Sequence, residues 1–139
     1  MDTNINILVV EDSEFQSEIF AFYLKGMGFN KITQAGNGAE AFALLEKDSY
    51  DLIISDWEMP EMDGLELLGR IRQNDILENI PFIILTVFDD KEKIIAAVKA
   101  GITDYIVKPV ERNVLEKKIK NIFGWFKLLS KNKVFPAKF

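Results

Sequence analysis

The chain has 139 residues, of which 48% are hydrophobic and 28% charged, a balance typical of one soluble globular domain rather than of a disordered segment. It contains no cysteine and no histidine, which excludes disulfides, thiolate and imidazole metal ligands, and a phosphohistidine on this chain. The net charge of −5 divides into +7 for residues 108–139 and −12 for residues 1–107, and an acidic body repels phosphate, so we expect no direct nucleic-acid binding. No apolar run reaches membrane-spanning length and the first residues lack a signal-peptide pattern, so we expect a cytoplasmic protein without a membrane segment.

Short apolar runs bounded by turn residues recur along the chain and predict β-strands. They cover residues 5–10, 31–34, 52–56, 81–85 and 104–107. Each run is followed by a segment with helical periodicity, and these segments start near residues 13, 37, 65, 89 and 111. Strands that alternate with helices predict an α/β fold, a doubly wound five-stranded parallel sheet with helices on both faces. No linker composition or repeat divides the chain, so we expect one domain.

The helix boundaries carry recognisable capping residues. Ser13 has Gln16 three residues later, and Asn37 has Glu40 three residues later, which is the capping-box pattern. Gly101 provides a stop for the fourth helix. In the first helix the apolar positions that we assign at helical spacing are Phe15, Ile19, Phe22 and Met27.

Polar residues stand at the ends of four predicted strands: Glu11 and Asp12, Asp56, Thr86, and Lys108. The carboxyl ends of parallel strands share one edge of the sheet, where open α/β folds place their ligands. Three carboxylates brought together repel one another unless protons or a cation neutralise them. Oxygen ligands favour a hard cation such as Mg²⁺, which is commonly bound by one or two carboxylates together with a phosphate. A lysine and a hydroxyl suit a phosphoryl group, and a carboxylate can itself become an aspartyl phosphate.

With these residues in place, the chain resembles the receiver domain of two-component response regulators, and in particular chemotaxis-regulator-like receivers. The matching pieces are V-V-E-D at 9–12, A-G-N-G-A-E-A at 35–41, D-L-I-I-S-D-W-E-M-P-E-M-D-G at 51–64, I-I-L-T at 83–86 and Y-I-V-K-P at 105–109. Together they span about residues 5 to 124 in the right order. The resemblance implies a flavodoxin-like (βα)5 fold with strand order 2-1-3-4-5.

The resemblance also implies roles for the polar residues. Asp56 is expected to be the phosphoacceptor, and Mg²⁺ is expected on the side chains of Asp12 and Asp56, on the backbone carbonyl of Glu58, and on Glu11 through water. Lys108 is expected to pair with the phosphoryl oxygens. The acidic pair reads Glu-Asp where the family usually has Asp-Asp, and this change keeps both charges.

A second group of expectations concerns switching. Thr86 and Tyr105 resemble the pair that responds to phosphorylation, the bond before Pro109 is expected to be cis, and residues 89–126 resemble the face that the family uses for output. Val87 stands where the family usually has a small residue, so its branched side chain is expected to narrow access to Asp56 and to slow phosphate exchange. Trp57 is also expected at the access to the site. Phe88, next to Val87, is also large and is expected to affect the same rate but not the class of reaction.

We therefore expect a phospho-accepting receiver domain at residues 1–126, which takes its phosphoryl group from a histidine kinase or a histidine phosphotransfer protein. It would catalyse only its own phosphorylation and dephosphorylation and is not expected to be an enzyme that turns over a metabolite. Two alternatives are a pseudo-receiver that acts by protein interaction without phosphorylation, and a haloacid-dehalogenase-type phosphatase. The pseudo-receiver would lack one of the site residues, and the phosphatase carries D-x-D after its first strand, whereas here the acceptor follows the third strand.

Residues 127–139 form a basic and apolar tail or the start of a linker to an output domain. An apolar stripe runs into it at spacings of 4, 3, 4 and 3, through Leu115, Ile119, Ile122, Phe126 and Leu129. We expect its first half to pack on the sheet and its second half to contact the body, a second copy or a following domain.

Overall fold

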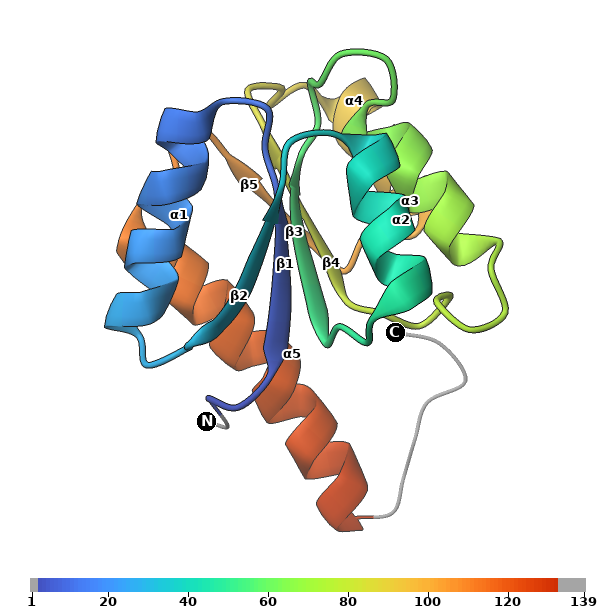
Figure 1. Ribbon diagram of the computed structural model, residues 1–139. Helices are drawn as coiled ribbons and strands as arrows, with labels where there is room; N and C mark the ends of the chain where they lie inside the picture. Colours follow the sequence, from blue (N-terminus) through green and yellow to red (C-terminus); the bar gives the residue numbers. More distant parts are fainter. Residues whose placement is uncertain (1–2, 133–139) are drawn as a thin grey trace.

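The fold is seen in a computed structural model that describes the backbone of residues 3–132 and side chains as far as residue 124. Strands and helices alternate strictly through this part of the chain (Figure 1). In order, the elements are β1 (Asn6–Val10), α1 (Glu14–Gly26), β2 (Lys31–Ala35), α2 (Gly38–Lys47), β3 (Leu52–Asp56), α3 (Gly64–Arg72), β4 (Phe82–Thr86), α4 (Lys91–Ala100), β5 (Asp104–Val107) and α5 (Arg112–Asn132). The predicted number and order of elements are confirmed.

All neighbouring strands pair in parallel, in the order β2-β1-β3-β4-β5. β3 and β4 are buried along their whole length, as expected for inner strands with helices on both faces. The register places Val10 opposite Ser55, Asp56 opposite Leu85, and Thr86 opposite Val107. The carboxyl ends of these strands therefore lie along one edge of the sheet, and the doubly wound architecture is confirmed.

Two hydrophobic clusters form the core, one on each face of the sheet. Along β1 the side chains alternate, because Ile7 and Val9 enter one cluster while Leu8 and Val10 enter the other. α1 and α5 cover the first face, and α2, α3 and α4 cover the second (Figure 1). This three-layer arrangement leaves the sheet edges and the strand ends as the places where polar groups can gather.

The apolar positions predicted at helical spacing in α1 are not all buried. Phe15 and Phe22 are 73% and 72% exposed, and the buried positions are Ser17, Phe20, Ala21 and Leu24. Both sets have helical spacing, and the buried one places Phe20 and Leu24 in the same hydrophobic cluster as Ile7 and Val9 of β1. Phe15 and Phe22, two of the apolar positions predicted at helical spacing, therefore lie on the exposed side of α1.

The predicted caps form, although the reciprocal half of each capping box is replaced. Ser13 Oγ accepts a hydrogen bond from the Gln16 N–H at 3.3 Å, while the Ser13 N–H donates to Glu11 Oε1 rather than to Gln16. Asn37 Oδ1 accepts from the Glu40 N–H at 2.8 Å, while Glu40 Oε2 accepts from the N–H of residue 36. The change at Ser13 ties the first helix cap to a carboxylate at the end of β1.

The first half of α5 packs on the sheet as predicted, with Leu115, Ile119 and Ile122 buried. The helical backbone continues to Asn132 and extends beyond the sheet in Figure 1. The predicted continuation of the stripe at Phe126 and Leu129 lies outside the described side chains. Within residues 3–132, none of the helices combines the length and the apolar character needed to cross a membrane.

Candidate functional site

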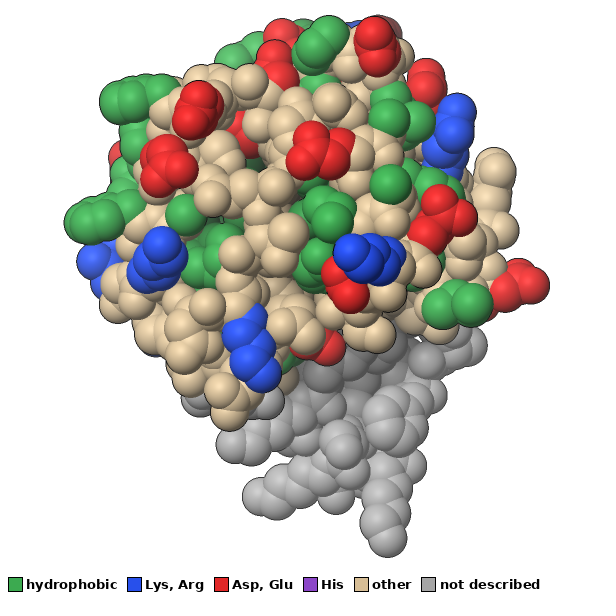
Figure 2. All heavy atoms as spheres, in the orientation of Figure 1, with side chains coloured by type: hydrophobic (Ala, Val, Ile, Leu, Met, Phe, Trp, Pro, Cys, Tyr) green, Lys and Arg blue, Asp and Glu red, His purple; other side chains and the backbone are tan. Residues whose placement is uncertain are grey.

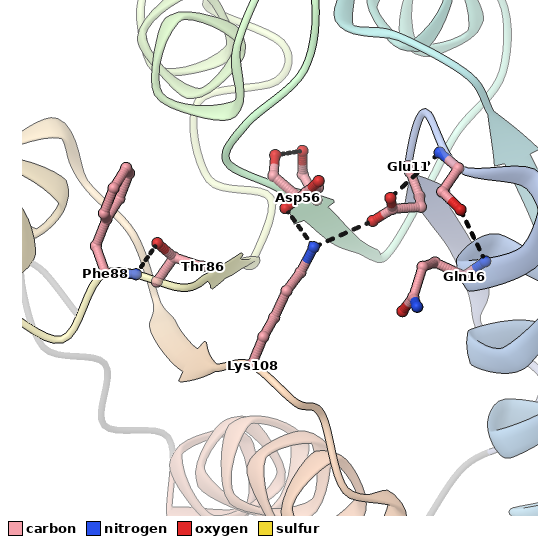
Figure 3. Close-up of polar contacts among 8 residues, drawn as sticks. Glu11, Gln16, Asp56, Thr86, Phe88 and Lys108 are labelled. Carbon is pink, nitrogen blue, oxygen red and sulfur yellow. Dashed lines mark hydrogen bonds and ion pairs between the residues drawn. The ribbon is translucent and has the colours of Figure 1, made fainter.

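The polar residues predicted at the strand ends meet at the carboxyl edge of the sheet. Glu11 and Asp12 directly follow β1, Asp56 ends β3, Thr86 ends β4, and Lys108 directly follows β5. Figure 3 shows Lys108 reaching between Asp56 and Glu11, with Thr86 close by on the neighbouring strand. The parallel register produces this convergence, because each strand delivers its last residue to the same edge.

Lys108 is the cation of the site. Its Nζ lies 2.9 Å from Asp56 Oδ1 and 3.8 Å from Glu11 Oε2. Asp56 and Glu11 are only 4% and 3% exposed, so these charges interact with little screening by solvent. The peptide bond between Lys108 and Pro109 is cis, as the resemblance implies.

Glu11 is a buried carboxyl group of the site with a raised pKa. Burial, and then the charge of Asp56, raise the pKa of Glu11 from 4.5 to about 7, although Lys108 acts in the opposite direction. Its Oε2 is buried and has no hydrogen-bond partner, since the 3.8 Å separation from Lys108 Nζ is too long for a hydrogen bond. A buried carboxylate oxygen without a donor marks a place where an additional positive group would be stabilising.

Three carboxylates are arranged for cation binding. One oxygen from each of Glu11, Asp12 and Asp56 lies within 4.8 Å of the other two, and Asp12 is exposed to solvent. Acidic side chains also crowd the upper part of the face in Figure 2, where the strands end in Figure 1. The donor set is all oxygen, which fits a hard divalent cation such as Mg²⁺.

Thr86 ends β4, the strand beside β3, and Tyr105 lies on β5, the next strand outward. Thr86 is buried, and its Oγ1 accepts a hydrogen bond of 2.9 Å from the Phe88 N–H. Tyr105 is half-buried on β5, the edge strand. The Thr86 hydroxyl is turned toward Phe88 (Figure 3), and the role of Thr86 and Tyr105 as a switch pair stays a prediction.

An open cavity of about 510 Å³ adjoins the acidic group. Asp12, Trp57, Glu58, Phe88 and Lys93 contribute to its lining. The Trp57 and Phe88 rings meet edge to face with centroids 5.3 Å apart, and Lys93 Nζ lies 5.0 Å from the centroid of Phe88. These aromatic rings form one wall beside the carboxylates.

Lys93 is a residue of the cavity lining that the sequence did not single out, whereas Phe88 was noted there as a large neighbour of Val87. Val87, which was expected to control access, is 57% exposed and is not among the lining residues. The positions of the two lining residues in the sequence point to the site, because Phe88 follows Thr86 by two residues and Lys93 lies in the first turn of the next helix. The backbone carbonyl of Glu58 as a metal ligand stays a prediction.

Comparison with known proteins agrees with this geometry. Residues 7–120 match the family described as response regulator receiver domain. The chain is 36% identical over 123 residues to the chemotaxis protein CheY-3 of Vibrio cholerae, covering 88% of this chain and 95% of that protein. Among solved structures, a response regulator from Chloroflexus aurantiacus J-10-fl superposes with a TM-score of 0.82 at 32% identity, covering 87% of this chain and 98% of that one.

A further solved structure concerns the metal. The receiver domain of a sensor histidine kinase from Pseudomonas aeruginosa PAO1, determined with a magnesium ion in its active-site cleft, superposes with a TM-score of 0.79 at 27% identity, covering 87% of this chain and 98% of that one. The fold, the convergence of acids and lysine at the sheet edge, and the match over residues 7–120 lead to one conclusion. The chain belongs to the response regulator receiver domain family.

Proposed function

We propose that this receiver domain accepts a phosphoryl group on Asp56 from the phosphohistidine of a partner protein. The observation that carries the proposal is the environment of Asp56, which is 4% exposed at the end of β3 and has Lys108 Nζ 2.9 Å from its Oδ1. In the reaction a carboxylate oxygen of Asp56 attacks phosphorus, the bond between phosphorus and the partner's imidazole nitrogen breaks, and the imidazole leaves. The Lys108 ammonium is placed to neutralise charge on the phosphoryl oxygens.

Magnesium is the cofactor of this proposal, since receiver domains generally bind Mg²⁺ at an acidic site and the residues here fit it. The side chains of Asp12 and Asp56 would hold the ion, Glu11 would act through water, and Glu58 would offer its backbone carbonyl. The unpartnered Glu11 Oε2 supports this assignment. When bound, the ion supplies positive charge that reduces repulsion between the carboxylates and the incoming phosphoryl group.

Signal output is proposed to pass through Thr86 and Tyr105 to residues 89–126, the α4-β5-α5 face. Thr86 ends β4 and pairs with Val107 of β5, and its hydroxyl accepts a hydrogen bond from the Phe88 N–H that a phosphoryl group could replace as its partner. Partners of this class are a histidine kinase or phosphotransfer protein on the input side, and a target protein, an output domain or a second copy on the output side. Residues 1–126 would make up the receiver unit and residues 127–139 a tail or linker.

The chemistry is confined to the protein's own phosphorylation and hydrolysis. Receiver domains are generally not enzymes that turn over a metabolite, and the cavity beside the acidic residues is open and lined by carboxylates, aromatic rings and Lys93. The proposal keeps the cytoplasmic location expected from the sequence.

Intact mass measurement after incubation with Mg²⁺ and a small-molecule phosphodonor tests this function. We expect one base-labile phosphoryl group on the wild type and none on Asp56→Asn. Asp75→Asn, which makes the same change at an exposed loop aspartate, should be modified like the wild type. An adduct that survives in Asp56→Asn would refute the acceptor assignment, and a wild type that neither gains phosphate nor binds beryllofluoride would favour a phosphorylation-independent module.

A further inference from the structure

Asp104, Tyr105 and Lys118 form a small cluster where β5 meets α5. Lys118 Nζ lies 2.9 Å from Asp104 Oδ1 and 5.7 Å from the centroid of the Tyr105 ring. The Tyr105 N–H donates a hydrogen bond of 2.8 Å to the same Asp104 oxygen. One carboxylate oxygen therefore anchors both the backbone of the tyrosine and the ammonium that faces its ring.

The packing of α5 on the core fixes the position of the Lys118 backbone. Leu115 and Ile119, which flank Lys118 on α5, are both fully buried, and they pack in the same cluster as Ile106 of β5. The Lys118 and Asp104 side chains are 30% and 27% exposed, so the pair is partly shielded from solvent. Lys118 is therefore held over the Tyr105 ring by helix packing and by an ion pair, and not by the ring contact alone.

The Tyr105 ring occupies an intermediate position. It is half-buried and packs against the hydrophobic cluster beneath α2, α3 and α4. The Thr86 hydroxyl, on the neighbouring strand, accepts a hydrogen bond from the Phe88 N–H. Any movement of the ring deeper into the body takes it away from the ammonium, because the ammonium is tied to Asp104 at the edge strand.

We propose that Lys118 is a positioning residue which, anchored by Asp104, holds the Tyr105 ring in its half-buried position and opposes its movement into the body when Asp56 is phosphorylated. This inference rests on the proposed function, in which Tyr105 responds to Asp56. It adds a restraint on the switch that comes from α5 and so couples the phosphoryl site to the helix that leads to the tail. A contact between a cation and an aromatic ring at a partly exposed site corresponds to about a two- to five-fold effect on such an equilibrium.

The test compares variants by fluorine NMR of protein that contains fluorotyrosine, free and with Mg²⁺ and beryllofluoride. Tyr23→Phe and Tyr50→Phe identify the Tyr105 resonance. Lys118→Met removes the charge and keeps an unbranched side chain of similar length. The matched control is Lys117→Met, which removes the same charge from the preceding, exposed position of α5.

We expect Lys118→Met to shift the Tyr105 resonance of the free protein and to lower the beryllofluoride concentration at half saturation about two- to five-fold. Lys117→Met should change neither, and Lys118→Arg should restore wild-type behaviour because it keeps the cation. Asp104→Asn should act in the same direction as Lys118→Met, and combining the two should add nothing further, because both break the same restraint. Urea unfolding of each variant confirms that it is folded.

The inference is overturned if Lys118→Met behaves like the wild type, or if Lys117→Met shows the same change, which would indicate a general charge effect. The failure of the proposed function gives a different result. If the wild type binds no beryllofluoride, the proposed role of Asp56 and its coupling to Tyr105 are refuted. The Tyr105 resonance of the free variants still decides whether Lys118 holds the ring.

Discussion

The buried Glu11 carboxyl should make the metal-free protein less stable as the pH rises, and Glu11→Gln isolates that effect. The pKa of Glu11 is raised from 4.5 to about 7, chiefly by burial and then by Asp56. Between these two values the folded chain keeps a proton that the unfolded chain has released. The favourable contribution of the protonated group is therefore complete below about pH 4.5 and is lost as the pH rises through about 7.

The size of the effect follows from the shift. A raise from 4.5 to about 7 corresponds to about 3 kcal/mol, at roughly 1.4 kcal/mol per pKa unit. Glutamine has a similar shape and stays neutral at every pH, so this part of the pH dependence should disappear in Glu11→Gln. Above about pH 8 the variant should exceed the wild type by up to about 3 kcal/mol relative to their difference near pH 4.5.

Urea unfolding in the presence of a chelator, between about pH 4.5 and about pH 8, measures the difference in unfolding free energy between wild type and variant. Glu18→Gln, at an exposed position of α1, removes the same charge and should leave the difference from the wild type constant across this range. Adding Mg²⁺ should stabilise the wild type more at about pH 8 than at about pH 5, because the ion favours the ionised carboxylates. A constant difference between wild type and Glu11→Gln across the whole range would refute the reasoning.

Two further predictions concern the packing that positions the site. Phe20→Ala should lower the unfolding free energy by about 3–5 kcal/mol, whereas Phe22→Ala on the exposed face of the same helix should change it by less than about 0.5 kcal/mol, and equal losses in urea unfolding would contradict the buried face assigned to α1. Gly64→Ala should be destabilising and should slow phosphorylation, because an added Cβ would clash with the Asp56 carbonyl oxygen and come within 2.9 Å of Trp57 Cα. Gly69→Ala, whose Cβ meets no atom within 4 Å, should instead stabilise α3 by up to about 1 kcal/mol. If Gly69→Ala also lowers the unfolding free energy, the clash does not explain the loss of stability in Gly64→Ala.

The sequence alone determined the architecture and which polar residues gather at the carboxyl edge of the sheet. Apolar runs that end in Glu11, Asp56, Thr86 and Lys108 are local patterns, and the strict alternation of strands and helices forces a parallel sheet. In such a sheet every strand end reaches the same edge, so the convergence of these residues follows from topology without knowledge of a single contact. The capping residues Ser13 and Asn37 likewise act on their own helices and were read correctly.

The tertiary structure decided what depends on neighbours that are distant in the sequence. The periodicity of α1 allowed two stripes, and only the fit of Phe20 and Leu24 against the sheet selects the buried one. Phe88 joins the wall of the cavity because Trp57, 31 positions earlier, presents its ring to it. Lys118 meets Tyr105 and Asp104 only because α5 returns across the sheet to its edge strand. Local patterns fix where an element begins and which residues end it, but the packing between elements determines which side chains touch, and packing is a property of the whole fold.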